Sequence, residues 1–176
     1  MATSSGGATL GSGARQALLW LGLTLVLFPL AISKPGLPTG LKSDEPAYYL
    51  AALSLARDGD LRFAPGEAER LFDEFPFQTV KNLILMTDDG WRTVYYGKPY
   101  IYSLFAAPFA GLFGANGMVS FNMLLLMAMV WMGASYLRRF NRDAVAVAYS
   151  AGFFILSSTF AYVFWLHPEL FNMACV

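Results

Sequence analysis

The sequence contains a single cysteine, Cys175, which excludes a disulfide framework within the chain and any zinc site built from cysteines. Charged residues are also scarce, at 14% of the 176 residues against about 25% in soluble domains. The 12 basic and 12 acidic residues cancel, so net charge gives no case for binding nucleic acid. We also find no phosphate-binding loop, nucleophile elbow or haem-attachment motif. The composition therefore argues against an ordinary soluble protein and gives no support for nucleic-acid binding.

Apolar residues are abundant instead, at 56% of the chain with a mean hydropathy of +0.47. Residues 16–33 and 144–166 are uncharged runs long enough to cross a bilayer. A third uncharged run, 99–137, would reach about 58 Å as one helix, almost twice the hydrocarbon thickness. We therefore divide it near Gly111, Gly114 and Gly117 into an interfacial helix over 99–114 and a membrane span over 115–137.

The fold class predicted from these runs is an all-α integral membrane protein with three transmembrane helices. Residues 167–176 form an extracytoplasmic segment or the start of a fourth span, because proline and an acid at residues 168 and 169 are helix-start signals. A large loop, residues 34–98, separates the first span from the interfacial helix. That loop is too small to form a core alone, so we expect it to lie on the membrane or on a partner.

The basic residues orient the spans. The short turn 138–143 carries Arg138, Arg139 and Arg142, and Arg15 precedes the first span. By the positive-inside rule, both mark the cytoplasmic side. The N-terminus is then cytoplasmic, whereas the large loop and the C-terminal residues are extracytoplasmic.

The N-terminal tail, residues 1–15, is rich in serine and glycine, and we expect its first 13 residues to be disordered. The first span resembles a signal peptide, with one cation before an apolar core. We expect it to be retained rather than cleaved.

Within the large loop, the sequence predicts a helix that opens at Ser43-Asp44-Glu45-Pro46 and ends near Gly59. A second short helix is predicted over 67–74. Residues 80–87 and 91–96 flank Asp88-Asp89-Gly90, which is a β-hairpin signal.

Two carboxylates give the sharpest chemical hypothesis. Asp44 and Glu45 follow the first span on the outer face beside Tyr48, and His167 and Glu169 leave the third span on the same face. Such a group can deprotonate an acceptor or bind a divalent ion opposite a lipid phosphate. The alternative is that Asp44 and Glu45 only cap a helix and that residues 167–169 form only a helical corner.

Lys98 lies where the loop returns to the membrane, among several tyrosines. A cation at headgroup depth can pair with a phosphate. The alternative is an ordinary lysine whose stem lies along apolar surface. Within the second span, we expect the methionines to pack and Asn116 and Asn122 to cap helices or bond across spans.

The order of these elements resembles the N-terminal part of GT-C-type integral membrane glycosyltransferases, the group of dolichyl-phosphate-mannose protein mannosyltransferases and aminoarabinose transferases. The resemblance covers nearly the whole chain and rests on short motifs: SDEPAYY at residues 43–49, YGKPYIYSL at 96–104, APF at 107–109 and HPE at 167–169.

The resemblance implies transfer of a sugar from a polyprenyl-phosphate donor on the extracytoplasmic face, and it makes a bacterial inner membrane the expected location. It makes Asp44 the catalytic base with Glu45 beside it, and it gives substrate binding to four residues: Tyr48, Lys98, His167 and Glu169. It assigns no metal site, and any further cofactor is unknown. Because the family has many more spans, three spans and a stub do not enclose a polyprenyl phosphate.

Two functions therefore stay open. One is the N-terminal module of such an enzyme. The other is a non-catalytic subunit of a larger respiratory, photosynthetic, secretory or transport complex, with the lipid bilayer and other membrane subunits as partners. A transporter fragment is a weaker third idea, because the spans hold no buried charge.

Overall fold

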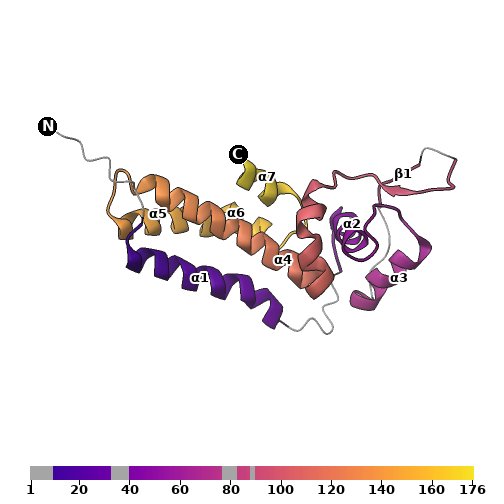
Figure 1. Cartoon of the computed structure of the whole chain (residues 1–176), viewed down its shortest axis with the longest axis horizontal. Helices are drawn as coiled ribbons and strands as arrows, with labels where there is room; N and C mark the ends of the chain where they lie inside the picture. Colours follow the sequence, from indigo (N-terminus) through magenta and orange to yellow (C-terminus); the bar gives the residue numbers. More distant parts are fainter. Residues whose placement is uncertain (1–9, 33–39, 77–82, 88–89) are drawn as a thin grey trace.

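The computed structural model describes residues 10–32, 40–76, 83–87 and 90–176 and gives an elongated, mostly helical molecule (Figure 1). The elements in chain order are α1 (Ser12–Ala31), α2 (Glu45–Arg57), α3 (Pro65–Glu74), β1 (Leu85–Met86), β2 (Tyr95–Tyr96), α4 (Ile101–Leu137), α5 (Asp143–Ile155), α6 (Ser158–Tyr162) and α7 (Glu169–Cys175). Helices α1, α4 and α5 run along the long axis, and α2, α3 and the hairpin gather at one end.

Helix α4 contains the break that a 39-residue apolar run requires. Gly114 has φ 61° and ψ −145°, a conformation open only to glycine, and helical structure resumes after it. Gly117 faces the carbonyl of Phe109, and a Cβ there would come within 1.9 Å of that oxygen. The break thus falls at Gly114, one of the three glycines near which the sequence predicts it.

Helix α1 packs along the second part of α4. Leu18 of α1 is buried against Met127, Val130 and Ala134, whose spacings of three and four residues place them on one face of α4. Much of the opposite face of α1 is exposed and apolar, including Trp20. Among the described residues, α1 and α4 are the two helices long and apolar enough to cross a membrane.

The single third helix predicted over residues 144–166 is wrong. Helix α5 ends at Ile155, and α6 begins again at Ser158. The backbone of Ser157 is extended, and its side-chain oxygen accepts the N–H of Thr159 as an N-terminal cap. A hydroxyl that competes for the helix backbone is thus the local cause of the break. A third membrane crossing stays a prediction.

The tail also differs from expectation at residues 10–13. Helix α1 begins at Ser12, four residues before the predicted span. Leu10 is buried, and the Gly11 N–H donates to the Asp143 carboxylate at 2.7 Å. A buried side chain and a charged acceptor therefore fix this part of the predicted disordered tail. Residues 1–9 lie outside the described residues.

The loop helices are confirmed. Helix α2 begins at Glu45 with proline in its first turn, and Gly59 follows its end with φ 74° and donates to the Ser54 carbonyl. Helix α3 begins two residues before the predicted 67. The hairpin is present but shorter than predicted, with Leu85 opposite Tyr96 and Met86 opposite Tyr95. The rest of the predicted first strand lies partly outside the described residues.

The core of this end forms between α2 and the first part of α4. Every side chain of α2 from Glu45 to Ser54 is buried. Tyr102, Ala106 and Ala110 of α4 belong to the same cluster as the buried residues of α2. The large loop therefore forms its core against α4 of the same chain.

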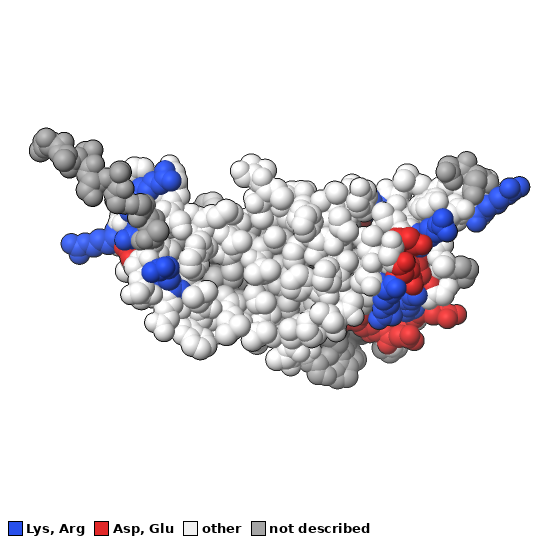
Figure 2. Space-filling view, viewed as in Figure 1, with Lys and Arg blue, Asp and Glu red and all other residues white. Residues whose placement is uncertain are grey.

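Charged side chains gather at the two ends of the molecule, with an uncharged surface between them (Figure 2). One end carries Arg15, the turn 138–142 and Asp143, and the other carries α2, α3 and the hairpin. This distribution is the one expected of a protein whose middle lies in hydrocarbon and whose ends lie in water.

Candidate functional site

Asp44 and Lys98 form an ion pair at the start of α2. The Lys98 amine donates to Asp44 Oδ2 at 2.6 Å, although the two residues are 54 apart in sequence. Lys98 lies between β2 and α4, so the ion pair joins the end of the hairpin to α2. The hydrogen bond to Asp44 raises the pKa of Lys98, which is therefore a cation at neutral pH.

Asp44 does not cap α2 with its side chain. Its backbone carbonyl accepts the N–H groups of Ala47 and Tyr48, but its carboxylate makes no capping hydrogen bond. Its carboxylate is about 29% exposed and faces the Lys98 amine. The interpretation of Asp44 as only a capping residue is therefore unsupported by its hydrogen bonds.

Glu45 is a buried anchor. One carboxylate oxygen accepts the Lys42 N–H at 2.5 Å, and the other accepts the Leu166 N–H at 3.0 Å. Glu45 is 8% exposed. Because both oxygens bind backbone donors, Glu45 ties the start of α2 to the segment that precedes α7.

Tyr48, His167 and Glu169 complete the cluster. The rings of Tyr48 and His167 lie 5.7 Å apart, and His167 Nδ1 is 3.6 Å from Glu169 Oε1. Burial raises the pKa of the Tyr48 hydroxyl, with the negative charges of Asp44 and Glu169 adding to the effect and Lys98 opposing it. Glu169 Oε2 is buried and has no hydrogen-bond partner among the described residues. The structure thus brings all six candidate residues together.

A cavity of about 490 Å³ adjoins this cluster between α2, the break in α4 and the segment before α7. Its wall includes Glu45, Asn116, Trp165 and His167, with apolar side chains over most of the remainder. Ser43, also in the wall, has φ 51°, a strained conformation of the kind that concentrates at functional sites.

Two further polar residues, which no sequence motif marks as part of the site, fix the backbone around it. Asn122 is fully buried, accepts from the Tyr102 hydroxyl and donates to the carbonyls of Val163 and Trp165. These hydrogen bonds fix the backbone segment that leads to His167. An asparagine in an apolar run was the available signal. The sequence predicts that Asn122 caps a helix or bonds across spans, and the structure shows it bonding from α4 to the segment after α6.

Glu74 is the second such residue. One of its oxygens accepts the Ala115 N–H at 3.1 Å, just after the break in α4, and the other accepts the Tyr49 hydroxyl. Burial raises the pKa of Tyr49 above its ordinary range, and the adjacent Glu74 charge adds to this. The carboxylate also lies at the positive end of the helix that follows Gly114. Nothing local in the sequence marks this role.

Within the described part of the chain, no three His, Cys, Asp or Glu side chains are grouped as a metal site would require. Comparisons of the chain with protein-family models, with curated proteins and with solved structures found no match. The site must therefore be interpreted from its own geometry.

Proposed function

We propose that the chain is the N-terminal module of a membrane glycosyltransferase that transfers a sugar from a polyprenyl phosphate on the extracytoplasmic face. The observation that carries the proposal is the Asp44–Lys98 ion pair. The cavity is lined by Ser43 and Glu45, the chain neighbours of Asp44, and not by the ion pair itself. A cation able to bind a phosphate and a partly exposed carboxylate able to take a proton are the two groups that such a transfer needs.

Membrane location supports the proposal. Helices α1 and α4 are long and apolar enough to cross a bilayer, and their exposed apolar side chains suit lipid contact. We propose that the arginine-rich end is cytoplasmic, that α5 and α6 together make the third crossing, and that the cluster around Asp44 lies at the outer surface. The donor phosphate then meets Lys98 at headgroup depth.

The proposed reaction is a direct displacement. Lys98 transfers its hydrogen bond from Asp44 to the donor phosphate, which frees the Asp44 carboxylate. The acceptor hydroxyl gives its proton to Asp44 while its oxygen bonds to the anomeric carbon of the sugar. The bond from that carbon to the phosphate oxygen breaks, and its electron pair leaves with the polyprenyl phosphate, whose charge Lys98 neutralises.

The other residues of the cluster have supporting roles in this proposal. Glu45 positions Asp44 through its two backbone hydrogen bonds. The unpaired Glu169 Oε2 is an acceptor for a substrate hydroxyl, and His167 and Tyr48 form the adjacent wall.

The test is Asp44→Asn in the natural protein in its own membranes, assayed with a panel of labelled undecaprenyl-phosphate sugars. Loss of the base predicts that transfer falls by about 10²–10⁴-fold while membrane insertion is unchanged. Asp73→Asn, an exposed carboxylate of α3, is the matched control and should keep wild-type turnover. Unchanged turnover in Asp44→Asn would remove Asp44 from the mechanism.

A binding measurement separates the phosphate role. Undecaprenyl phosphate should raise the unfolding temperature of the wild-type protein, whereas undecaprenol should not. Lys98→Gln should lose this stabilisation because the phosphate then lacks its cation. Equal stabilisation of both proteins would contradict the role of Lys98.

The second candidate is a non-catalytic subunit of a larger membrane complex. It is favoured by the fact that both oxygens of Glu45 and one of Asp44 already bind groups of this chain. It predicts stoichiometric membrane partners that co-purify equally with the wild type and with Asp44→Asn, and no transfer by either. The intact mass of the natural polypeptide, measured with its co-purifying partners, separates the two candidates.

A further inference from the structure

The end of the molecule opposite the candidate site has an excess of positive charge. Arg15, Arg138, Arg139 and Arg142 lie there, and Asp143 is the acid of the same region. Asp143 is fully engaged, because one oxygen contacts Arg138 Nε at 2.6 Å and the other accepts the Gly11 N–H. The side chains of the other three arginines are exposed.

A groove of about 400 Å³ lies between α1 and the second part of α4. Its lining includes Leu18, Gly22 and Val26 from α1 and Met127 and Trp131 from α4, and none of its lining side chains is charged. The glycine leaves room at the centre of the groove, since a Cβ at Gly22 would only make ordinary contact with Met127.

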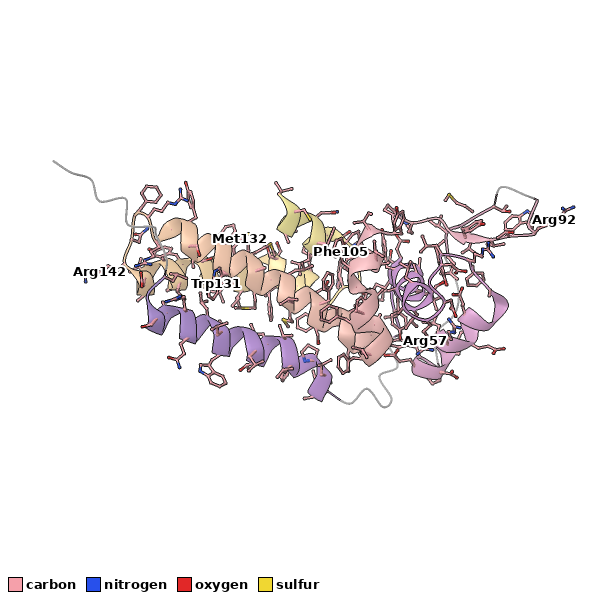
Figure 3. The ribbon with its side chains drawn as sticks, viewed as in Figure 1. Arg57, Arg92, Phe105, Trp131, Met132 and Arg142 are labelled. Atoms are coloured by element: carbon pink, nitrogen blue, oxygen red, sulfur yellow. The ribbon has the colours of Figure 1, made fainter. Side chains whose placement is uncertain are left out.

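The groove runs toward the basic end. Arg15 precedes the lining residues Leu18 and Leu19 by three and four positions, which places all three on one face of α1. Trp131 precedes Arg138 by seven positions, so it lies two turns away on the same face of α4. Trp131 and Arg142 lie toward the same end of the molecule (Figure 3).

Aromatic side chains accompany the arginines. The Arg139 guanidinium lies 5.8 Å from the centre of the Tyr136 ring, and Phe140 is 73% exposed in the adjacent turn. Tyrosine and arginine beside a long apolar surface are typical of the level at which lipid headgroups lie.

We propose that this groove and the basic end form a binding site for an anionic phospholipid, with one acyl chain in the groove and the headgroup at Arg15. Charge complementarity selects the headgroup, because the region has three exposed arginines and its acid is already engaged. The apolar lining of the groove favours the acyl chain of the lipid.

The experiment uses the full chain in detergent micelles and native mass spectrometry. Phosphatidylglycerol and phosphatidylcholine with identical acyl chains are titrated against the wild type, Arg15→Gln, Arg15→Lys and Ala128→Leu, which narrows the groove from the exposed side of α4. Arg92→Gln, at the hairpin end, is the matched control (Figure 3). Inorganic phosphate is added as a competitor.

The wild type should bind phosphatidylglycerol more tightly than phosphatidylcholine, and high salt should reduce the difference. Arg15→Gln should weaken phosphatidylglycerol binding about fivefold, with Arg15→Lys restoring most of it. Ala128→Leu should weaken both lipids, and Arg92→Gln should weaken neither. None of these variants changes the cluster around Asp44, so failure of the transferase proposal would not affect this result.

Three outcomes would overturn the proposal. Equal binding of the two lipids by the wild type would remove the headgroup site. Wild-type binding by Ala128→Leu would remove the groove. Full displacement by inorganic phosphate would indicate a site for free anions rather than a lipid.

Discussion

At the scale of single residues, neighbouring carboxylates have different environments. Glu45 has both oxygens on backbone N–H groups, whereas Asp44 faces a lysine and is partly exposed. Both oxygens of Glu45 therefore hold chain segments together, whereas the carboxylate of Asp44 faces a side chain that a substrate phosphate can draw away. The pair therefore divides into a positioning residue and a candidate base.

Glu74 also acts by position, and its removal gives a test of stability. Glu74→Ala should lower the free energy of unfolding by about 2–3 kcal/mol, because the Ala115 N–H and the buried Tyr49 hydroxyl both lose a charged acceptor. Thermal unfolding in detergent measures the change. Glu69→Ala, an exposed site on the same helix, should change it by less than about 0.5 kcal/mol. Equal effects of the two variants would show that Glu74 is not an anchor.

At the scale of elements, the break in α4 joins the apolar helices to the end of the molecule that carries α2, α3 and the hairpin. The α4 residues before Gly114 and those up to Phe121 belong to the core cluster of α2, whereas those from Met127 onward pack on α1. Glu74 binds directly after the break, so α3 fixes the angle between the two parts. One glycine thus places the cluster around Asp44 relative to the apolar bundle.

Gly114→Ala tests this element. A Cβ would lie 2.7 Å from Glu74 Oε2, and the positive φ is unfavourable for alanine. We expect a loss of about 2–3 kcal/mol in unfolding free energy. Gly152→Ala, at a helical position of α5 with open space around it, should be neutral or stabilising. A neutral Gly114→Ala would mean that the helix straightens without cost.

At the scale of the whole molecule, charged side chains lie at the two ends and leave an uncharged surface between them in the view of Figure 2. The arginine-rich end and the hairpin end lie on opposite sides of the bilayer in the proposed orientation. The candidate transferase site and the proposed lipid site therefore use different leaflets.

Cysteine labelling of intact and lysed cells tests the orientation. In a Cys175→Ala background, Arg92→Cys should react with a membrane-impermeant maleimide in intact cells whose outer membrane has been permeabilised. Arg142→Cys should react only after the cells are lysed. The two positions lie at opposite ends (Figure 3). Labelling of both in intact cells, or the reverse pattern, would contradict the assigned topology.

The sequence by itself determined the features that depend on neighbours along the chain. The start of α2 at Glu45, its end before Gly59 and the helix after His167 follow from capping, proline and glycine chemistry. The long apolar runs follow from composition, and a run longer than a membrane must break where glycines permit it.

Tertiary structure decided what joins distant segments. The ion pair of Asp44 with Lys98 and the hydrogen bond of Glu74 to Ala115 span 54 and 41 residues, and no local pattern encodes such pairings. The division of the expected third span at Ser157 was likewise missed, because a hydroxyl in an apolar run is compatible with a continuous helix. Composition and period fix where a helix can form, whereas long-range packing fixes which polar groups meet and therefore where chemistry is possible.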